Sequence, residues 1–185
     1  MAQAARHWMI LIAGPVRSGK STLARRIAER FSGTRVGFGD AVRQRTQTLG
    51  LPDERSSWQQ VGEEWVARDP EGLCDAVLAP TAGQSLVVVD GVRHRSVHDL
   101  LRARAEGRRV VLVFVDAQVS VRRDRLASDG ISDEAMGLVL SHSTETELPW
   151  LRDRADIVAD GTGDAELVLG ALEALITGAC SQKSR

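Results

Sequence analysis

One short glycine-rich segment constrains the fold of this chain more than any other feature. Residues 14–22 read GPVRSGKST and directly follow the apolar run 8–13. They match the pattern G-x-x-x-x-G-K-[S/T], and helical spacing continues over residues 21–31. A strand, a glycine loop and a helix in this order gather backbone N–H groups and the positive end of a helix around one small volume. The segment therefore predicts a phosphate-binding loop.

The chemistry of a nucleotide triphosphate assigns roles within this loop. Lys20 would supply a full positive charge during phosphoryl transfer, and Ser21 would bind Mg²⁺ through its hydroxyl. Lys20 and Lys183 are the only lysines among 24 basic residues, which singles out Lys20 in the body of the chain. The residues expected to contact the donor nucleotide here are Gly14, Val16, Arg17, Ser18, Gly19, Lys20, Ser21 and Thr22.

Apolar runs and stretches of helical spacing alternate along the chain, which is typical of a parallel sheet covered by helices. Strands are expected at residues 8–13, 34–38, 85–89, 110–115 and 155–158. Helices are expected at residues 21–31, 40–49, 56–68, 73–79, 97–106, 119–128, 133–142 and 164–177.

The length of 185 residues suits one α/β domain, expected over residues 1–180. Breaker clusters at residues 50–53 and 69–72 indicate a helical insertion at residues 40–80. The remaining predicted parts are a core of residues 8–39, 81–127 and 153–178, a lid of residues 128–152 and a frayed tail of residues 181–185.

Composition excludes several classes of partner. The 24 Lys and Arg residues nearly balance 25 Asp and Glu residues, giving a net charge of −1, which suits neither nucleic acid nor a membrane surface. The longest apolar runs fall well short of the roughly 20 residues that span a bilayer. Cys74 and Cys180 are far apart and form no CxxC pattern, which favours a reducing compartment. We expect a cytoplasmic monomer or homodimer whose partner is a small molecule.

Two acid–base pairs follow expected strands, where ligands bind in parallel sheets. Asp40 and Arg43 lie three residues apart in an expected helix and so share a face, suited to Mg²⁺ waters and an acceptor phosphate respectively. Asp90 follows an apolar run and would hold Mg²⁺ through water, while Arg93 would reach the transferring or acceptor phosphate. The alternatives are a helix-terminal acid beside a solvated arginine for the first pair, and a turn acid for Asp90.

Arginines also precede the expected lid. Arg122 and Arg125 lie on the helix at residues 119–128 and would bring positive charge to the transition state while the lid excludes water. The alternative is an ordinary solvated helix face.

Earlier in the chain, Trp58 and Trp65 lie seven residues apart on the insertion helix. Packing of both rings in the core is favoured over stacking on an acceptor base.

The segments GPVRSGKST, GDAVR, VVVDGVR and RRDRL together resemble the adenylate-kinase-like branch of P-loop kinases, in particular deoxynucleoside monophosphate kinases and dephospho-CoA kinases. The likeness covers residue 9 to about residue 175. It implies a three-layer α/β/α P-loop NTPase fold with a five-stranded parallel sheet, an acceptor-binding insertion and a short closing lid. It also implies transfer of a phosphoryl group from MgATP to a nucleoside monophosphate or a similar small acceptor.

The same resemblance implies roles for individual residues. Asp40 matches an acid near Mg²⁺ or the acceptor, Arg43 the arginine on the acceptor phosphate, and Asp90 the acid beside Mg²⁺. Arg122 and Arg125 match lid-base arginines. Gly161 and Thr162 fall in the loop that passes the donor adenine.

Three functions are consistent with these residues. Transfer to a phosphate acceptor is favoured, because Arg43 lies beside Asp40 and such an acceptor needs no base. A hydroxyl acceptor, such as a nucleoside or a dephospho-CoA-like compound, would instead pass its proton to Asp40. A regulatory ATPase switch would transfer the phosphoryl group to water.

Overall fold

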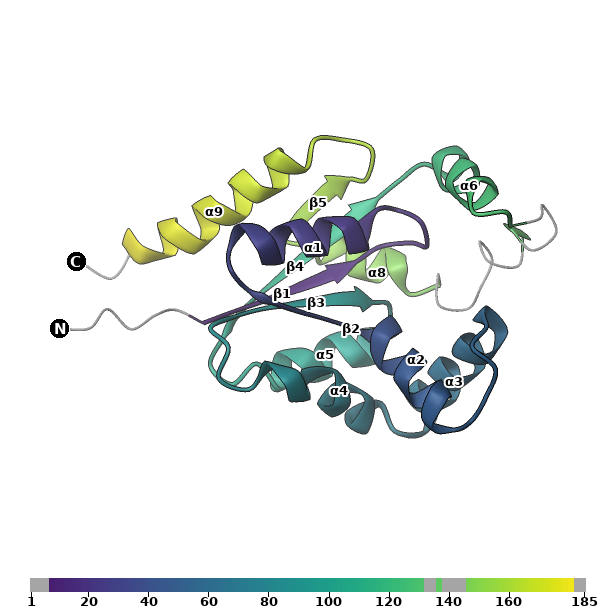
Figure 1. The fold of residues 1–185 in the computed structure, drawn as a ribbon. Coiled ribbons are helices and arrows are strands. Elements are labelled where there is room, and N and C mark those ends of the chain that lie inside the picture. Colours follow the sequence, from purple (N-terminus) through teal and green to yellow (C-terminus); the bar gives the residue numbers. More distant parts are fainter. Residues whose placement is uncertain (1–6, 132–135, 138–145, 182–185) are drawn as a thin grey trace.

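The computed structural model describes residues 7–131, 136–137 and 146–181 (Figure 1). Most of the expected helix at residues 133–142, all but residues 136–137, and most of the expected tail at 181–185 lie outside the described residues.

The centre of the fold is a sheet of five parallel strands in the order β2-β3-β1-β4-β5, which confirms the predicted fold class. Ile12 in the central strand lies opposite Asp90 on one side and Val113 on the other, so neighbouring strands end close together. The strands are β1 (Trp8–Ala13), β2 (Thr34–Gly37), β3 (Leu86–Val92), β4 (Arg109–Asp116) and β5 (Ile157–Asp160).

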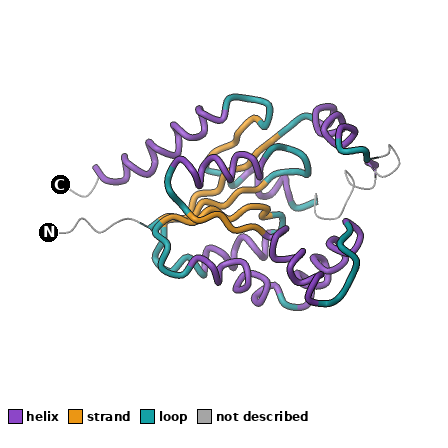
Figure 2. Tube along the Cα trace, in the orientation of Figure 1, coloured by secondary structure: helices purple, strands orange, loops and turns teal. Residues whose placement is uncertain are grey.

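Helices cover both faces of the sheet and extend beyond its carboxyl edge (Figures 1 and 2). Helices α1 and α9 lie over one face, and α4, α5 and α8 lie over the other. Helices α2 and α3 stand beyond the carboxyl edge, as an insertion does. The helices are α1 (Lys20–Arg30), α2 (Phe38–Thr48), α3 (Arg55–Arg68), α4 (Pro70–Leu78), the 3₁₀ turn η1 (Ala79–Thr81), α5 (Arg95–Ala103), α6 (Val119–Ser128), α8 (Leu148–Asp153) and α9 (Ala165–Ser181).

The central strand supplies side chains to two separate halves of the core, because alternate residues of a strand point to opposite faces. Ile10 and Ile12 pack with α1 and α9, whereas Met9 and Leu11 pack with α4, α5 and α8. All four are fully buried. A strand covered on both faces must be apolar throughout, which is why residues 8–13 show no alternation.

The structure differs from the predicted elements at several ends and contains one helix, α8, that was not predicted. Helix α4 begins at Pro70 rather than near residue 73, because the Asp69 carboxylate accepts a hydrogen bond of 2.8 Å from Gly72 N and proline suits the first helical turn. Inside the predicted lid, Leu148 and Leu151 of α8 are buried in the core beneath the sheet. One face of helix α8 therefore packs as part of the core.

In the part of the chain that the structure describes, no helix combines the length and apolar character needed to cross a bilayer.

Candidate functional site

Two cavities meet at the phosphate-binding loop. The first, here called the insertion cavity, has a volume of about 530 Å³ and lies among the loop, α2, α3 and the end of β3. The second, here called the α9 cavity, has a volume of about 560 Å³ and lies among α1, α6 and the segment leading into α9. Arg17, Lys20 and Ser21 line both cavities, so the two spaces adjoin at these three side chains.

The loop itself is closely packed against the ends of β1 and β4. A Cβ atom at Gly14 would lie 2.3 Å from the carbonyl oxygen of Val115, so this position needs glycine. Lys20 is buried, and its Nζ donates a hydrogen bond of 3.0 Å to the carbonyl oxygen of Pro15. Val16 and Ser18 lie within the loop, where Ser18 N donates to the same carbonyl at 3.2 Å. The lysine ammonium is thus folded back over the loop that precedes it.

Two arginines of α6 hold this loop from the other side. Arg122 is buried, and its Nε donates a hydrogen bond of 2.8 Å to the carbonyl oxygen of Val16. Arg125 donates from Nη1 to the carbonyl oxygen of Arg17 and from Nη2 to that of Gly161, both at 2.9 Å. In this geometry both side chains fix the backbone of the loop. Their expected action in the transition state stays a prediction.

The segment after β5 contacts the loop through its backbone. A Cβ atom at Gly161 would lie 1.8 Å from the carbonyl oxygen of Ser18, so only glycine permits this approach. Gly161 and Thr22 line the α9 cavity, with Gly19. Thr162 donates from its backbone N and its Oγ1 to Asp160 Oδ1, at 2.8 and 2.7 Å, and these bonds lower the pKa of Asp160.

At the opposite edge of the loop, Arg35 joins two of the predicted acids. Its Nη2 donates to Asp90 Oδ2 at 2.8 Å, and its Nη1 donates to Asp40 Oδ2 at 3.2 Å. Burial alone would lower the pKa of Arg35, but the hydrogen bond and charge of Asp90, with those of Asp40, raise it. Sequence reasoning missed Arg35; the one signal was a charged residue inside an otherwise apolar strand.

Asp90 is 5% exposed, as expected for an acid at the mouth of a buried strand. Its Oδ1 atom is buried and has no hydrogen-bond partner among the described residues. A buried carboxylate oxygen without a donor fits a magnesium ion bound through water, with Ser21, which lines the same cavity, as the hydroxyl ligand. The residues present therefore fit the predicted metal.

Asp40 and Arg43 share a face of α2, as predicted from their spacing. Arg43 Nη1 lies 3.7 Å from Asp40 Oδ1, and the Arg43 guanidinium stands 4.6 Å from the centroid of the Trp58 ring. Trp58 lines the insertion cavity, whereas Trp65 packs against the core, so the two tryptophans have different surroundings. The favoured core placement thus holds for Trp65 but not for Trp58.

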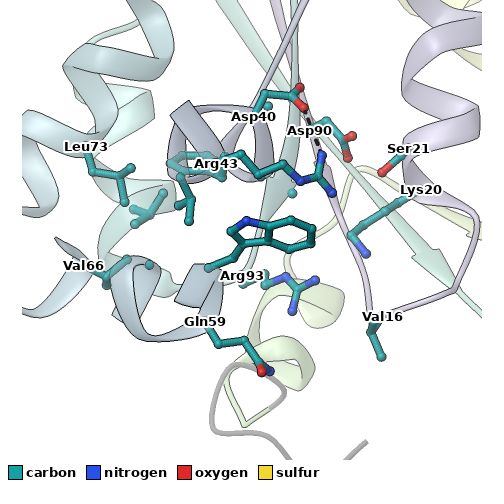
Figure 3. Close-up of a pocket in the computed structure, with 18 of the residues that line it drawn as sticks. Val16, Lys20, Ser21, Asp40, Arg43, Gln59, Val66, Leu73, Asp90 and Arg93 are labelled. Carbon is teal, nitrogen blue, oxygen red and sulfur yellow. Dashed lines mark ion pairs between the residues drawn. The ribbon is translucent and has the colours of Figure 1, made fainter. Parts of the chain in front are cut away.

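Two further arginines line the insertion cavity. Arg93 follows β3 as predicted, and Arg55 begins α3. Burial lowers the pKa of Arg55, and the nearby charge of Arg17 adds to this effect. Lys20 and Ser21 of α1, Asp40 of α2, Asp90 of β3 and Arg93 after β3 converge on this cavity, with Gln59 and Val66 of α3 across from them (Figure 3).

A glycine loop between the central strand and a helix, beside a buried aspartate on the neighbouring strand, defines a P-loop nucleotide-binding protein. A family model described as an AAA domain matches residues 10–147. The match spans most of the 185 residues, and the chain belongs to the AAA domain family. No curated protein matches the chain.

Solved structures of P-loop kinases share this fold. Shikimate kinase from Acinetobacter baumannii, in complex with shikimate, has a TM-score of 0.65 and 18% identity over 97% of this chain and 96% of that one. A sugar kinase from Janibacter sp. has a TM-score of 0.51 and 20% identity over 91% and 94%. A gluconokinase from Sinorhizobium meliloti has a TM-score of 0.53 and 22% identity over 95% and 97%. The predicted adenylate-kinase-like P-loop kinase fold is confirmed.

Proposed function

We propose that this protein is an ATP-dependent kinase that transfers the γ-phosphoryl group to a small anionic acceptor, a nucleoside monophosphate. The observation that carries the proposal is the meeting of two cavities at Lys20 and Ser21. A donor whose phosphates lie on the loop could present its terminal phosphorus to an acceptor in the neighbouring cavity. Direct transfer requires this proximity, and no covalent enzyme intermediate is needed.

The donor side of the proposal rests on the loop and its metal ligands. The backbone N–H groups of the loop and Lys20 would hold the β- and γ-phosphates of ATP, and the α9 cavity would take the rest of the nucleotide. Ser21 and the unpartnered Oδ1 of Asp90 would hold Mg²⁺ directly and through water. Bound Mg²⁺ would neutralise charge on the donor phosphates.

The acceptor side rests on positive charge around the insertion cavity. Arg35, Arg43, Arg55 and Arg93 all line it, which suits an acceptor that carries its own negative charge. Trp58 offers a flat apolar surface in the same cavity, against which a base could pack.

A phosphate acceptor also fits the state of Asp40. This carboxylate lies in ion pairs with Arg35 and Arg43, and an ionised phosphate oxygen needs no base to attack. One acceptor oxygen would bond to the γ-phosphorus while the bond from that phosphorus to the β,γ-bridging oxygen breaks. The products are ADP and a nucleoside diphosphate, and no proton needs to leave.

A hydroxyl acceptor is the second candidate, favoured by one observation. Asp40 is exposed at the cavity wall, where it could take the proton of a hydroxyl as the oxygen bonds to phosphorus. The similar structures named as kinases of shikimate and gluconate support the same alternative.

The experiment is an ADP-release assay with MgATP and separate panels of nucleoside monophosphates, nucleosides, dephospho-CoA, shikimate and gluconate. We expect ADP to form with one or more monophosphates and the signal to disappear in the Lys20→Ala variant. Turnover with hydroxyl compounds alone would replace the first candidate by the second. Steady hydrolysis that no acceptor changes would instead indicate an ATPase switch, and the absence of any ATP consumption would overturn the proposal.

A further inference from the structure

We infer that Arg17 is a further catalytic residue, which brings positive charge to the transferring phosphoryl group from within the phosphate-binding loop itself. The inference rests on the proposed kinase function. It assigns to the Arg17 side chain a task beyond the backbone contact expected of every residue in the loop.

Position is the first argument. Among the residues that the structure describes, three line both cavities: Arg17, and Lys20 and Ser21, which already belong to the donor site. The boundary between the cavities is where the γ-phosphorus would pass from donor to acceptor. A guanidinium there has the planar set of donors that suits the equatorial oxygens of a transferring phosphoryl group.

The backbone of Arg17 is the second argument. Its φ is +59°, in the left-handed region where a side chain costs on the order of 1 kcal/mol and glycine costs nothing. The other described non-glycine residues with positive φ, Ser32 and Glu106, follow the ends of α1 and α5, where such turns are common. Arg17 lies in a loop that would be less strained with glycine, so the arginine side chain must contribute something that outweighs the strain.

The backbone of Arg17 is held by a hydrogen bond, whereas its side chain is exposed. Its carbonyl oxygen accepts a hydrogen bond of 2.9 Å from Arg125, which holds the backbone in place. Its side chain is 45% exposed, and the guanidinium forms an ion pair with Asp129, the residue that follows α6. An exposed ion pair contributes little stability, so it offers a resting position that a stronger anion can replace.

The positive charge of the nearby Arg55 favours the replacement of Asp129 by a phosphate. Arg17 lies close enough to Arg55 for the two positive charges to act on one another. A phosphoryl group between the cavities would place negative charge near both. On binding of the triphosphate, Arg17 would leave Asp129 and contact the γ-phosphate oxygens, whose charge it would stabilise as the bond to the leaving oxygen breaks.

The test compares wild type with Arg17→Gly, a substitution that relieves the backbone strain instead of adding to it. We expect kcat with the acceptor found in the ADP-release assay to fall by about 1,000-fold or more, as for other transition-state arginines, with KM for ATP changed far less. Affinity for ADP with aluminium fluoride, which mimics the transferring phosphoryl group, should fall, while affinity for ADP alone should not. Thermal unfolding should occur at or above the wild-type temperature.

Two controls make the result specific. Ser32→Gly relieves a similar backbone, with φ +51°, at an exposed turn and should leave kcat unchanged. Glu106→Gly relieves a similar backbone, with φ +52°, at a position that lines neither cavity and should also leave kcat unchanged.

Each contrary result has a definite meaning. Wild-type kcat in Arg17→Gly, or equal binding of ADP with aluminium fluoride, would overturn the inference and leave the kinase function intact. A loss of kcat accompanied by a lower unfolding temperature would show a structural role and also overturn it. A wild-type protein without acceptor-dependent turnover would overturn both the function and the inference.

Discussion

Arg35 Nη2 lies 2.8 Å from Asp90 Oδ2, and this pair joins the edge strand β2 to the buried acid of its neighbour β3. The register places Gly37 opposite Asp90, so Arg35 reaches forward along the sheet to the carboxylate. Arg35 therefore neutralises Asp90 from within the protein at one carboxylate oxygen, while the other oxygen is buried without a hydrogen-bond donor among the described residues. The acid is held in position before any cation binds.

This pair predicts a stability defect in Arg35→Ala. Removal of the guanidinium leaves the Asp90 carboxylate buried and without its partner, which should lower the free energy of unfolding by about 1–3 kcal/mol. Urea unfolding at neutral pH measures the change. Asp90→Asn and the double variant complete a cycle, in which the double variant should lose less than the sum of the single losses. Strict additivity would show that the two side chains do not interact.

The approach of Gly161 to the phosphate loop predicts a second defect. Gly161→Ala would place a methyl group 1.8 Å from the carbonyl oxygen of Ser18, and both backbones would have to move apart. We expect a loss of about 1–3 kcal/mol in unfolding free energy and weaker binding of ATP by calorimetry. Gly170→Ala is the matched control, because its added methyl would lie within 4 Å of no described atom beyond its chain neighbours and the backbone of its own helix, and helix α9 should gain stability. Equal behaviour of the two variants would contradict the packing argument.

Arg43 offers a test of the acceptor site under the proposed function. Arg43→Ala should raise KM for the acceptor about tenfold or more and leave KM for ATP nearly unchanged, because Arg43 lines only the insertion cavity. Steady-state kinetics with each substrate varied in turn measures both constants.

Arg45→Ala is the control for Arg43→Ala. Arg45 lies on the same helix and stacks on Trp65 with its guanidinium 4.3 Å from the ring centroid, but it does not line the cavity. A similar increase in KM for both substrates, or the same increase in acceptor KM in both variants, would place the acceptor elsewhere.

Local patterns predicted the parts of the site that are local in sequence. The loop at Lys20 follows from one motif, and the contact between Asp40 and Arg43 follows from a spacing of three residues on a helix. Arg35 could not be assigned in this way. Its contacts depend on β2 lying next to β3, a choice of strand order that no single strand encodes.

The dependence of contacts on how the elements pack also explains why the places of Arg55, Leu148 and Leu151 were not predicted from the sequence. Arg55 reaches the insertion cavity because α3 packs back toward the phosphate loop. Its neighbour there, Arg17, lies 38 positions earlier in the chain. Leu148 and Leu151 were assigned to the lid because the surrounding sequence is irregular, yet their spacing of three residues turns both toward the core. Helical periodicity over six residues is too short a signal to recognise in advance.

The Cys74 thiol predicts a dependence of stability on alkaline pH. Burial raises its pKa from 9.0 to about 11, so the folded protein keeps the thiol protonated where an unfolded chain would ionise it. The unfolded state therefore releases a proton first, and the stability that this group contributes is complete below about pH 9 and is lost as the pH rises toward 11. Wild type should lose up to about 1.4 kcal/mol per pH unit more than Cys74→Ala across this range, as measured by urea unfolding.

Thiol labelling tests the burial of Cys74 directly. In a Cys180→Ser background, a thiol reagent at pH 8 should modify Cys74 only after unfolding. Rapid labelling of the native protein, or parallel stability curves for the two proteins, would show that the thiol is accessible and ionises normally.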